Sequence, residues 1–197
     1  MAPFQTYIIC NLKKEHDRFL KIFSQVLSRG IEKESVQVIA PTWEDELSSE
    51  TIFNVYDPYL YRGAIPPFKS GTASLKEISL VLNYVAVFQH AAAANLDDSV
   101  IILVLESGTT LHRQFLPNLQ KILEEPTWDC VRLIGESEER AENSFPTGAI
   151  LFRMEFVRKL LKTIMPFRES IDAELRFQVM LHKAKVVMAS PPLAARI

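Results

Sequence analysis

Short apolar runs alternate with longer amphipathic stretches along the chain, a pattern typical of an α/β protein. Apolar runs of strand length predict six β-strands, at residues 4–10, 36–40, 99–105, 128–134, 147–153 and 185–188. Between them, apolar residues recur every three or four positions, which predicts helices over residues 15–28, 74–94, 112–123, 155–164 and from 170 onward. Repeated alternation of strand and helix predicts a mainly parallel sheet with helices on both faces.

Residues 74–111 carry the strongest pattern in the chain. Ser74 and Glu77 have the spacing of a capping box at the start of a long apolar helix. The run from Val100 to Leu105 has no polar residue, which is typical of a strand covered on both faces. Ligands of open α/β sheets bind beyond the carboxyl ends of the strands. Glu106, the first polar side chain after this strand, is therefore the first candidate for chemistry.

The organisation of the rest of the chain predicts a single domain over residues 1–197. No internal repeat, low-complexity tract or second core interrupts the α/β pattern. The least regular part is 41–71, which is long for a loop inside a compact domain. It is rich in aromatic residues, which suit stacking on a base or sugar ring but equally suit covering the sheet.

Composition narrows the functional classes. Apolar residues make up 48% and charged residues 23% of the chain, and the net charge of −2 gives no basic footprint for nucleic acid. No apolar run reaches the roughly 20 residues of a membrane span. The first residues lack the pattern of a signal peptide. We expect Cys10 and Cys130 to be buried thiols in a reducing compartment, the alternative being a disulfide, and the location to be cytoplasmic.

Several segments, taken in order, resemble motifs of glycosyltransferase family 25, the lipopolysaccharide-type and collagen-type sugar transferases. Near the start, ICNL at 9–12 with Arg18 resembles the family's INLxxxxxR, and KEISLVLNY at 76–84 resembles GEIGCxLSH. Later segments follow the family's WDxxxLG, GTxAYLIS and PxDxxL patterns and end in SPPL; they are 128–135, 147–153, 170–175 and 190–193.

The resemblance implies a Rossmann-type GT-A fold and transfer of a sugar from a nucleotide-sugar donor to a glycan or other hydroxyl acceptor, with inversion. It implies catalytic roles for Glu106 and Asp172. It implies nucleotide-sugar binding by Asn11, Leu12, Arg18, Glu77, Asn83, Tyr84, Ser107 and Thr147. Two departures concern the chemistry: the family's LEDD is LESG at 105–108, and its Ser-His is Asn83-Tyr84.

Sugar transfer requires that the leaving diphosphate be neutralised and that a base take the proton of the acceptor. Glu106 is the only carboxylate left from the LEDD motif, so we assign no metal site. Three interpretations stay open: a metal-independent enzyme that uses Arg18 or a lysine, an enzyme that binds Mn²⁺ or Mg²⁺ weakly through Glu106, and a degenerate module that binds without transfer.

Some candidate residues also have purely structural interpretations. Asn11 has the character of a turn residue, and Arg18 that of a solvated helix charge. Asp172 is the candidate base, but a first-turn aspartate also stabilises its own helix. A generic nucleotide-binding α/β protein, unrelated to the family, is the remaining alternative for the chain.

Overall fold

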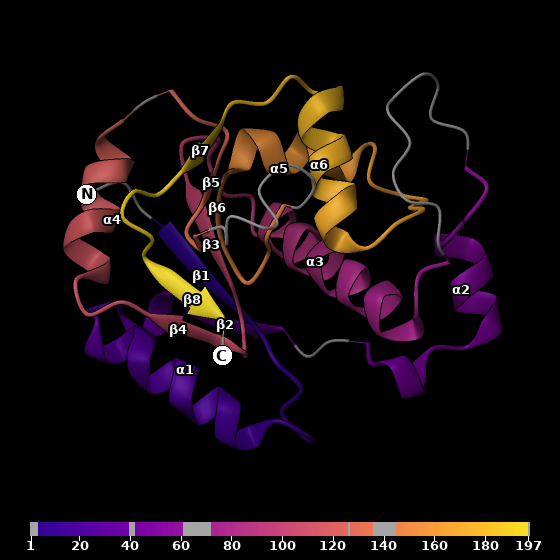
Figure 1. Ribbon diagram of the computed structural model, residues 1–197, viewed down its shortest axis with the longest axis horizontal. Helices are drawn as coiled ribbons and strands as arrows, with labels where there is room; N and C mark the ends of the chain where they lie inside the picture. The colour runs from indigo at the N-terminus through magenta and orange to yellow at the C-terminus, as the bar shows by residue number, and fades with distance from the viewer. Residues whose placement is uncertain (1–3, 40–41, 61–71, 126, 136–144, 197) are drawn as a thin grey trace.

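The computed structural model describes residues 4–39, 42–60, 72–125, 127–135 and 145–196. A six-stranded sheet forms its centre, in the order β2-β1-β3-β6-β5-β7 (Figure 1). Its strands are β1 (Phe4–Ile9), β2 (Val36–Ile39), β3 (Ile101–Glu106), β5 (Cys130–Arg132), β6 (Ala149–Arg153) and β7 (Val186–Met188). All run in one direction except β6, which is antiparallel to both of its neighbours. The predicted mainly parallel sheet is confirmed.

Helices cover both faces of this sheet, as the sequence predicted. The helices are α1 (His16–Ser28), α2 (Ser49–Val55), α3 (Leu75–Ala93), α4 (Phe115–Glu124), α5 (Met154–Leu161) and α6 (Ile171–Leu181). Apolar residues of α3, α5 and α6 form one core with the sheet, and those of α1 and α4 form the other (Figure 1). No helix in the described parts of the chain is long and apolar enough to cross a membrane.

The long helix α3 begins at the predicted capping box. The Ser74 hydroxyl accepts a hydrogen bond from the Glu77 backbone amide, and the Glu77 carboxylate accepts one from the Ser74 amide at 2.8 Å. This reciprocal cap satisfies two amides that a helix otherwise leaves unpaired. It also fixes where α3 starts, and so which of its residues face the sheet.

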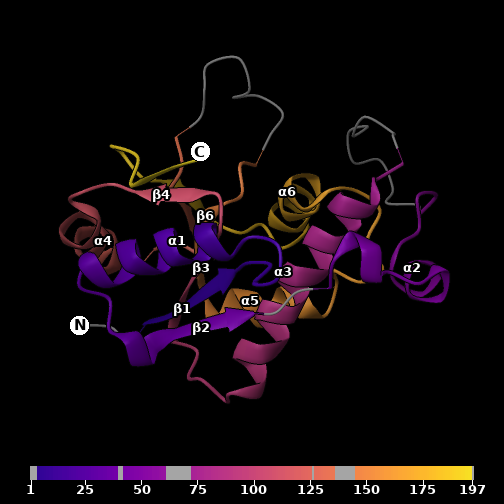
Figure 2. The ribbon, with the colours of Figure 1, turned by 90° about the horizontal axis from the view of Figure 1, so that it is seen from below.

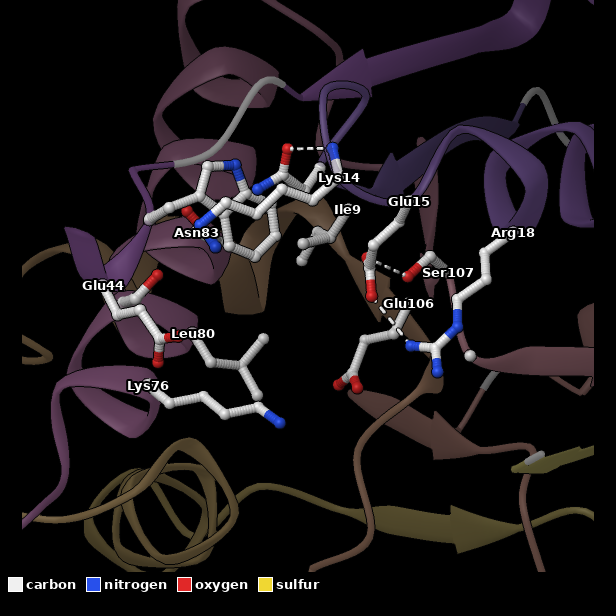
Figure 3. Close-up of a pocket in the computed structure, with 14 residues that line it drawn as sticks. Ile9, Lys14, Glu15, Arg18, Glu44, Lys76, Leu80, Asn83, Glu106 and Ser107 are labelled. Carbon is white, nitrogen blue, oxygen red and sulfur yellow. Dashed lines mark hydrogen bonds and ion pairs between the residues drawn. The ribbon is translucent and has the colours of Figure 1, made fainter. Parts of the chain in front are cut away.

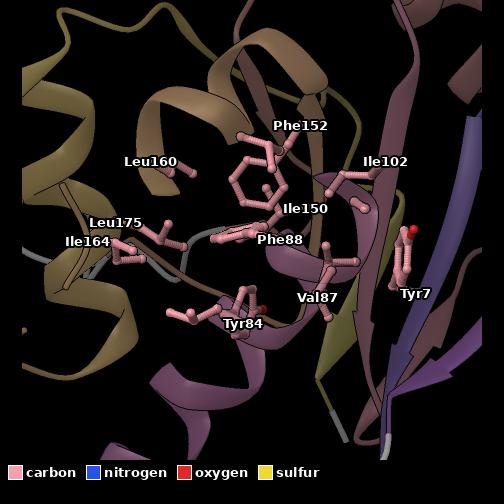
Figure 4. Packing of buried hydrophobic residues seen from close by; sticks show 14 of the residues in the cluster. Tyr7, Tyr84, Val87, Phe88, Ile102, Ile150, Phe152, Leu160, Ile164 and Leu175 are labelled. Carbon is pink, nitrogen blue, oxygen red and sulfur yellow. The ribbon is translucent and has the colours of Figure 1, made fainter. Parts of the chain in front are cut away.

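The larger core lies between α3 and the central strands. Phe88 of α3 packs edge-on against Phe152 of β6, with ring centroids 5.2 Å apart. Tyr84 and Val87 flank Phe88 on the helix, and Ile102 of β3 lies in the same cluster (Figure 4). All of these side chains are almost fully removed from solvent. The apolar periodicity of the sequence therefore marks the face of α3 that is buried.

The helices within residues 41–71 and a second, small sheet were not predicted. Residues 41–71 were expected to be irregular, but they include α2 and a short 3-10 helix, η2 (Glu44–Glu46); residues 61–71 lie outside the described part. α2 has no buried residue, so its sequence carries no apolar periodicity, and it lies on the outer side of α3 (Figure 2). A small sheet of β4 (Thr109–Leu111) and β8 (Ala194–Arg196) was also missed, because each strand has only three residues.

Both cysteines are free and buried, as predicted, and they belong to cores on opposite faces of the sheet. Burial raises the pKa of the Cys130 thiol to about 12. This thiol therefore stays protonated at neutral pH and is a poor nucleophile.

Replacement of Phe88 by alanine tests the core on α3. We expect Phe88→Ala to lower the free energy of unfolding by about 3–5 kcal/mol, because it removes a fully buried ring and leaves a cavity. Phe53→Ala on α2 is the matched control: its ring is 86% exposed, so its effect should stay within about 0.5 kcal/mol. Urea unfolding measures both, and equal losses in the two variants would contradict the assignment of the core.

Candidate functional site

The carboxyl ends of β1 and β3 meet at one edge of the sheet. The two strands are parallel neighbours, with Ile9 opposite Glu106. Just beyond them, the backbone amide of Ser107 donates to the carbonyl of Ile9 at 3.0 Å. The polar residues that follow each strand are therefore brought together, which is the arrangement expected of a ligand site in an open α/β sheet.

A first cavity of about 350 Å³ opens at this edge, between the strand ends, the start of α1 and the first half of α3 (Figure 3). Its volume lies in the range of small-molecule sites. It is lined by Ile9, Asn11, Lys14, Glu15, Arg18, Trp43, Glu44, Lys76, Ser79, Leu80, Asn83, Glu106, Ser107 and Gly108. Five of the predicted site residues, from four separate segments of the sequence, thus line one cavity: Asn11, Arg18, Asn83, Glu106 and Ser107.

The turn into α1 shapes one wall of the first cavity. The side-chain oxygen of Asn11 accepts hydrogen bonds from the backbone amides of Lys13 and Lys14, both at 3.0 Å. Asn11 is buried and acts here as the turn residue that the sequence allowed. The turn brings Lys14 to the cavity, and its ammonium group pairs with Asp45 of η2 at 2.8 Å.

Glu15 links the predicted residues Arg18 and Ser107. Its carboxylate accepts a hydrogen bond from the Ser107 hydroxyl at 2.8 Å and forms an ion pair with Arg18 at 2.8 Å. The Arg18 side chain is 64% exposed, and an exposed pair of this kind contributes little stability. Arg18 can therefore turn toward an anionic ligand at small cost. Sequence reasoning did not select Glu15, since a helix-start glutamate is common on a protein surface.

Glu106 is held from behind by Tyr84. The buried Tyr84 hydroxyl donates to one carboxylate oxygen of Glu106 at 2.9 Å and accepts from the Gly148 amide at 3.3 Å. Burial and the negative charge of Glu106 raise the pKa of Tyr84 well above its usual value, so the hydroxyl stays protonated and keeps donating. The carboxylate is therefore held at the sheet edge with its other oxygen unconstrained by this bond.

Gly148 is the backbone support of this arrangement. Its φ of 109° is a conformation that favours glycine, and an added Cβ would lie 2.7 Å from the side chain of Ile134. Its carbonyl accepts from the Glu106 amide and the Thr109 hydroxyl, both at 2.8 Å. Gly148, which directly precedes β6, thus forms hydrogen bonds to the backbone of Glu106 and to the side chain of Tyr84, which holds the Glu106 carboxylate.

A second cavity of about 340 Å³ adjoins the first and shares Lys76, Leu80, Glu106 and Gly108 with it. Its lining is Lys76, Glu77, Leu80, Glu106, Gly108, Thr109, Thr147, Ser170, Ile171, Asp172 and Arg196. The predicted pair Glu106 and Asp172 therefore lines one space, together with Thr147 and Glu77. Glu106 stands at the junction of the two cavities.

Arg196 of β8 completes the second cavity. Its guanidinium donates to the Thr147 hydroxyl at 2.6 Å and to the Thr147 carbonyl at 3.2 Å, and it lies 3.9 Å from an oxygen of Asp172. Sequence reasoning missed this residue, because a three-residue strand at the end of the sequence carries too few positions to show a pattern. The resemblance to SPPL just before it was the only signal in that region.

Three predicted residues differ in placement from the rest. Leu12 and Tyr84 line neither of these two cavities: Leu12 is exposed beside the turn, and Tyr84 lies behind Glu106. Glu77 lines the second cavity, but its carboxylate is engaged in the cap of α3. Lys76 and Ser79 line the first cavity and were not predicted, although their spacing from Asn83 on α3 is a detectable helical signal.

The charges around the first cavity are balanced. Lys14, Arg18 and Lys76 face Glu15, Glu44 and Glu106. Within the described ranges, no three His, Cys, Asp or Glu side chains come close enough together to hold a metal ion. Lys76 forms no ion pair with any described carboxylate, and its side chain extends toward the same space as Glu106 (Figure 3).

Comparison with known proteins identifies the class of fold. No family model matches the chain, and no curated protein matches its sequence. The structure is similar to that of S. aureus TarS 1–349, a glycosyltransferase, with a TM-score of 0.50 and 10% identity over 98% of this chain. The chain spans 60% of that TarS structure. The protein thus has a glycosyltransferase-like α/β fold.

Tyr84→Phe tests the support of Glu106. The variant should lose about 1–3 kcal/mol of unfolding free energy at pH 8, because it leaves one carboxylate oxygen of Glu106 and the buried Gly148 amide without their partner. The raised pKa of Tyr84 also gives a pH signature. Above about pH 10, Tyr84 ionises in the unfolded chain but stays protonated in the folded one, so the wild type loses stability as pH rises.

Phenylalanine cannot ionise, so the gap in unfolding free energy between wild type and Tyr84→Phe should narrow between pH 8 and pH 10.5. Tyr59→Phe is the control, because its ring is 89% exposed. Denaturant unfolding at both pH values measures the gap. A gap that stays constant with pH would show that the Tyr84 hydroxyl does not titrate as this environment requires.

Proposed function

We propose that the protein is a glycosyltransferase of the GT-A kind, similar to family 25, which transfers a sugar from a nucleotide-sugar donor to a hydroxyl group of a glycan or other acceptor. The observation that carries the proposal is the pair of adjoining cavities that meet at Glu106. A group-transfer enzyme needs two such spaces, one for the donor and one for the acceptor. The glycosyltransferase-like fold agrees with this assignment.

The first cavity suits the donor. It lies at the carboxyl ends of parallel strands and at the start of α1, where nucleotides bind in many α/β proteins. Arg18 and Lys76 supply positive charge for the diphosphate. Because Lys76 lines both cavities and forms no ion pair with a described carboxylate, it is well situated to stabilise the charge that develops on the leaving diphosphate.

A divalent cation would supply the same stabilisation. Mn²⁺ and Mg²⁺ prefer carboxylate oxygens, and the unconstrained oxygen of Glu106 is one such ligand. An ion held there would take most of its remaining ligands from the donor diphosphate and from water. When bound, it would act as a Lewis acid toward the leaving group. Metal dependence is therefore an arm of the binding experiment below.

The second cavity suits the acceptor. In our proposal Asp172 takes the proton of the acceptor hydroxyl. The oxygen of that hydroxyl forms a bond to the anomeric carbon, and the bond from that carbon to the diphosphate oxygen breaks. Attack comes from the side opposite the leaving group, so the configuration inverts. The two adjoining cavities, which share Glu106 in their lining, agree with this geometry. Arg196 lies 3.9 Å from Asp172 and lines the same cavity.

A binding module without transfer activity is the second candidate. It is favoured by one observation: Asn11, Glu77 and Ser107, all predicted to bind the donor, have side chains engaged in structural hydrogen bonds. Such a module would keep the donor cavity but lack turnover. Binding and turnover must therefore be measured separately.

Donor binding is tested by thermal unfolding with nucleoside diphosphates. At a concentration of about 100 Kd, the ligand should raise Tm by about 5–10 °C. Lys76→Ala should reduce this rise, whereas Lys21→Ala, an exposed change on α1 outside both cavities, should leave it unchanged. Runs with and without Mn²⁺ distinguish metal-assisted from metal-free binding. If no nucleoside diphosphate raises Tm in either condition, the donor site is wrong.

Turnover is tested by Glu106→Gln in an assay with a panel of sugar nucleotides. Glutamine keeps the acceptor oxygen for Tyr84, so Tm should change little, but turnover should fall by about 10²-fold or more because one charge at the reacting centre is lost. Glu124→Gln, on the surface of α4, is the control and should be fully active. A wild type that binds donors yet transfers no sugar would support the binding module instead.

A further inference from the structure

One face of α3 forms a wall of the first cavity, and the residues along this wall change from charged to neutral. Lys76, Ser79, Leu80 and Asn83 line it, at the spacing of neighbours on one side of a helix. Lys76 and Asn83 are seven residues apart, which corresponds to about 10 Å along the helix axis. The wall therefore has a charged end, which reaches Glu106 and the second cavity, and a neutral polar end at Asn83.

The side chain of Asn83 has an unused hydrogen-bond donor. It is only 1% exposed, and its carbonyl oxygen accepts from the backbone amide of Thr42 at 3.0 Å. That bond fixes the orientation of the carboxamide, since the opposite orientation would set two donors against each other. The Asn83 Nδ2 group has no partner among the described residues. A buried donor left unpaired is unfavourable, so its presence on a cavity wall points to an acceptor on a ligand.

The segment next to Asn83 places an aromatic ring at the same end of the cavity. Ser79, one helical turn before Asn83, donates its hydroxyl to the Thr42 carbonyl, so α3 holds both polar groups of the Thr42 backbone. Trp43 follows directly and lines the first cavity. Its indole can stack on a planar ring such as a nucleobase.

The charged parts of a donor belong elsewhere in the cavity. Lys14, the cation that the Asn11 turn brings to the cavity, is already paired with Asp45 of η2 at 2.8 Å. The sugar must lie near Glu106 to reach the second cavity, and Lys76 at that end suits the diphosphate. The end at Asn83 and Trp43 is then left for the base.

We propose that Asn83 and Trp43 bind the nucleobase of the donor and that Asn83 Nδ2 donates to a ring carbonyl that cytosine and adenine lack, at pyrimidine position 4 or purine position 6. This inference rests on the proposed function of the first cavity. A base with a carbonyl at pyrimidine position 4 or purine position 6 satisfies the donor. An amino group at the same position would place its N–H groups against Asn83 Nδ2, which is also a hydrogen-bond donor. Uracil or guanine is therefore bound in preference to cytosine or adenine.

Titration calorimetry with matched ligands tests this selection. UDP and CDP differ at position 4 of the same ring system, and GDP and ADP compare a carbonyl with an amine at position 6. We expect UDP to bind about tenfold or more tightly than CDP, or GDP than ADP. Preference within the pyrimidine pair identifies uracil, and preference within the purine pair identifies guanine. Inorganic pyrophosphate, which has no base, measures the contribution of the diphosphate alone.

Asn83→Asp removes the Nδ2 hydrogen-bond donor but keeps the oxygen that accepts a hydrogen bond from the Thr42 amide. It should bring the two members of the selected pair within about threefold of each other, whereas Asn54→Asp on the exposed surface of α2 should preserve the preference. If Asn83→Asp does not fold, binding of the four nucleotides to the wild type still tests the selection. Equal binding of all four nucleotides, or a preference that survives Asn83→Asp, overturns the inference while leaving the donor site intact. If neither the nucleotides nor pyrophosphate bind, the proposed function itself fails.

Discussion

Parallel pairing of β1 with β3 determines where the polar residues at the ends of these two strands lie. The pairing brings Ile9 opposite Glu106, so the turn after β1 and the turn after β3 must share one edge of the sheet. The apolar face of α3 packs against the sheet, so the opposite side of this helix lines the first cavity. The hydrophobic contacts of one helix thereby fix the orientation of Lys76 and Asn83.

The fold was predictable from sequence to the extent that burial leaves a pattern. The six strands of the main sheet and the helices α1, α3, α4, α5 and α6 were predicted because apolar residues recur in each at regular spacing, and in all of them except β7 some of these residues are buried. α2 has no fully buried residue, only partly buried ones such as Ile52 and Val55, and it was missed. The reversed direction of β6 was also not predicted, since an apolar strand with both faces covered has the same composition in either direction.

The site was predictable only in part, for a different physical reason. Glu106, Asn11 and Ser107 follow strand ends, so the rule for open sheets selected them. Glu15 and Arg196 were missed because their importance depends on partners far away in sequence: Glu15 binds Ser107, and Arg196 binds Thr147. Tyr84 was predicted to touch the donor but lies behind Glu106. The spacing of residues in the sequence does not show whether a buried side chain reaches a cavity or is covered by another residue.

The two cavities are built from different parts of the chain. Apart from shared residues, the first is lined by the end of β1, the turn into α1, the start of α1, the η2 region, α3 and Ser107. The second draws Thr147, Asp172 and Arg196 from the last third of the sequence. Substitutions accumulating in β8 and the start of α6 would reshape the second cavity without disturbing the first. A lineage that carries this fold can therefore exchange one partner of its reaction while it retains the other, with Glu106 as the common boundary.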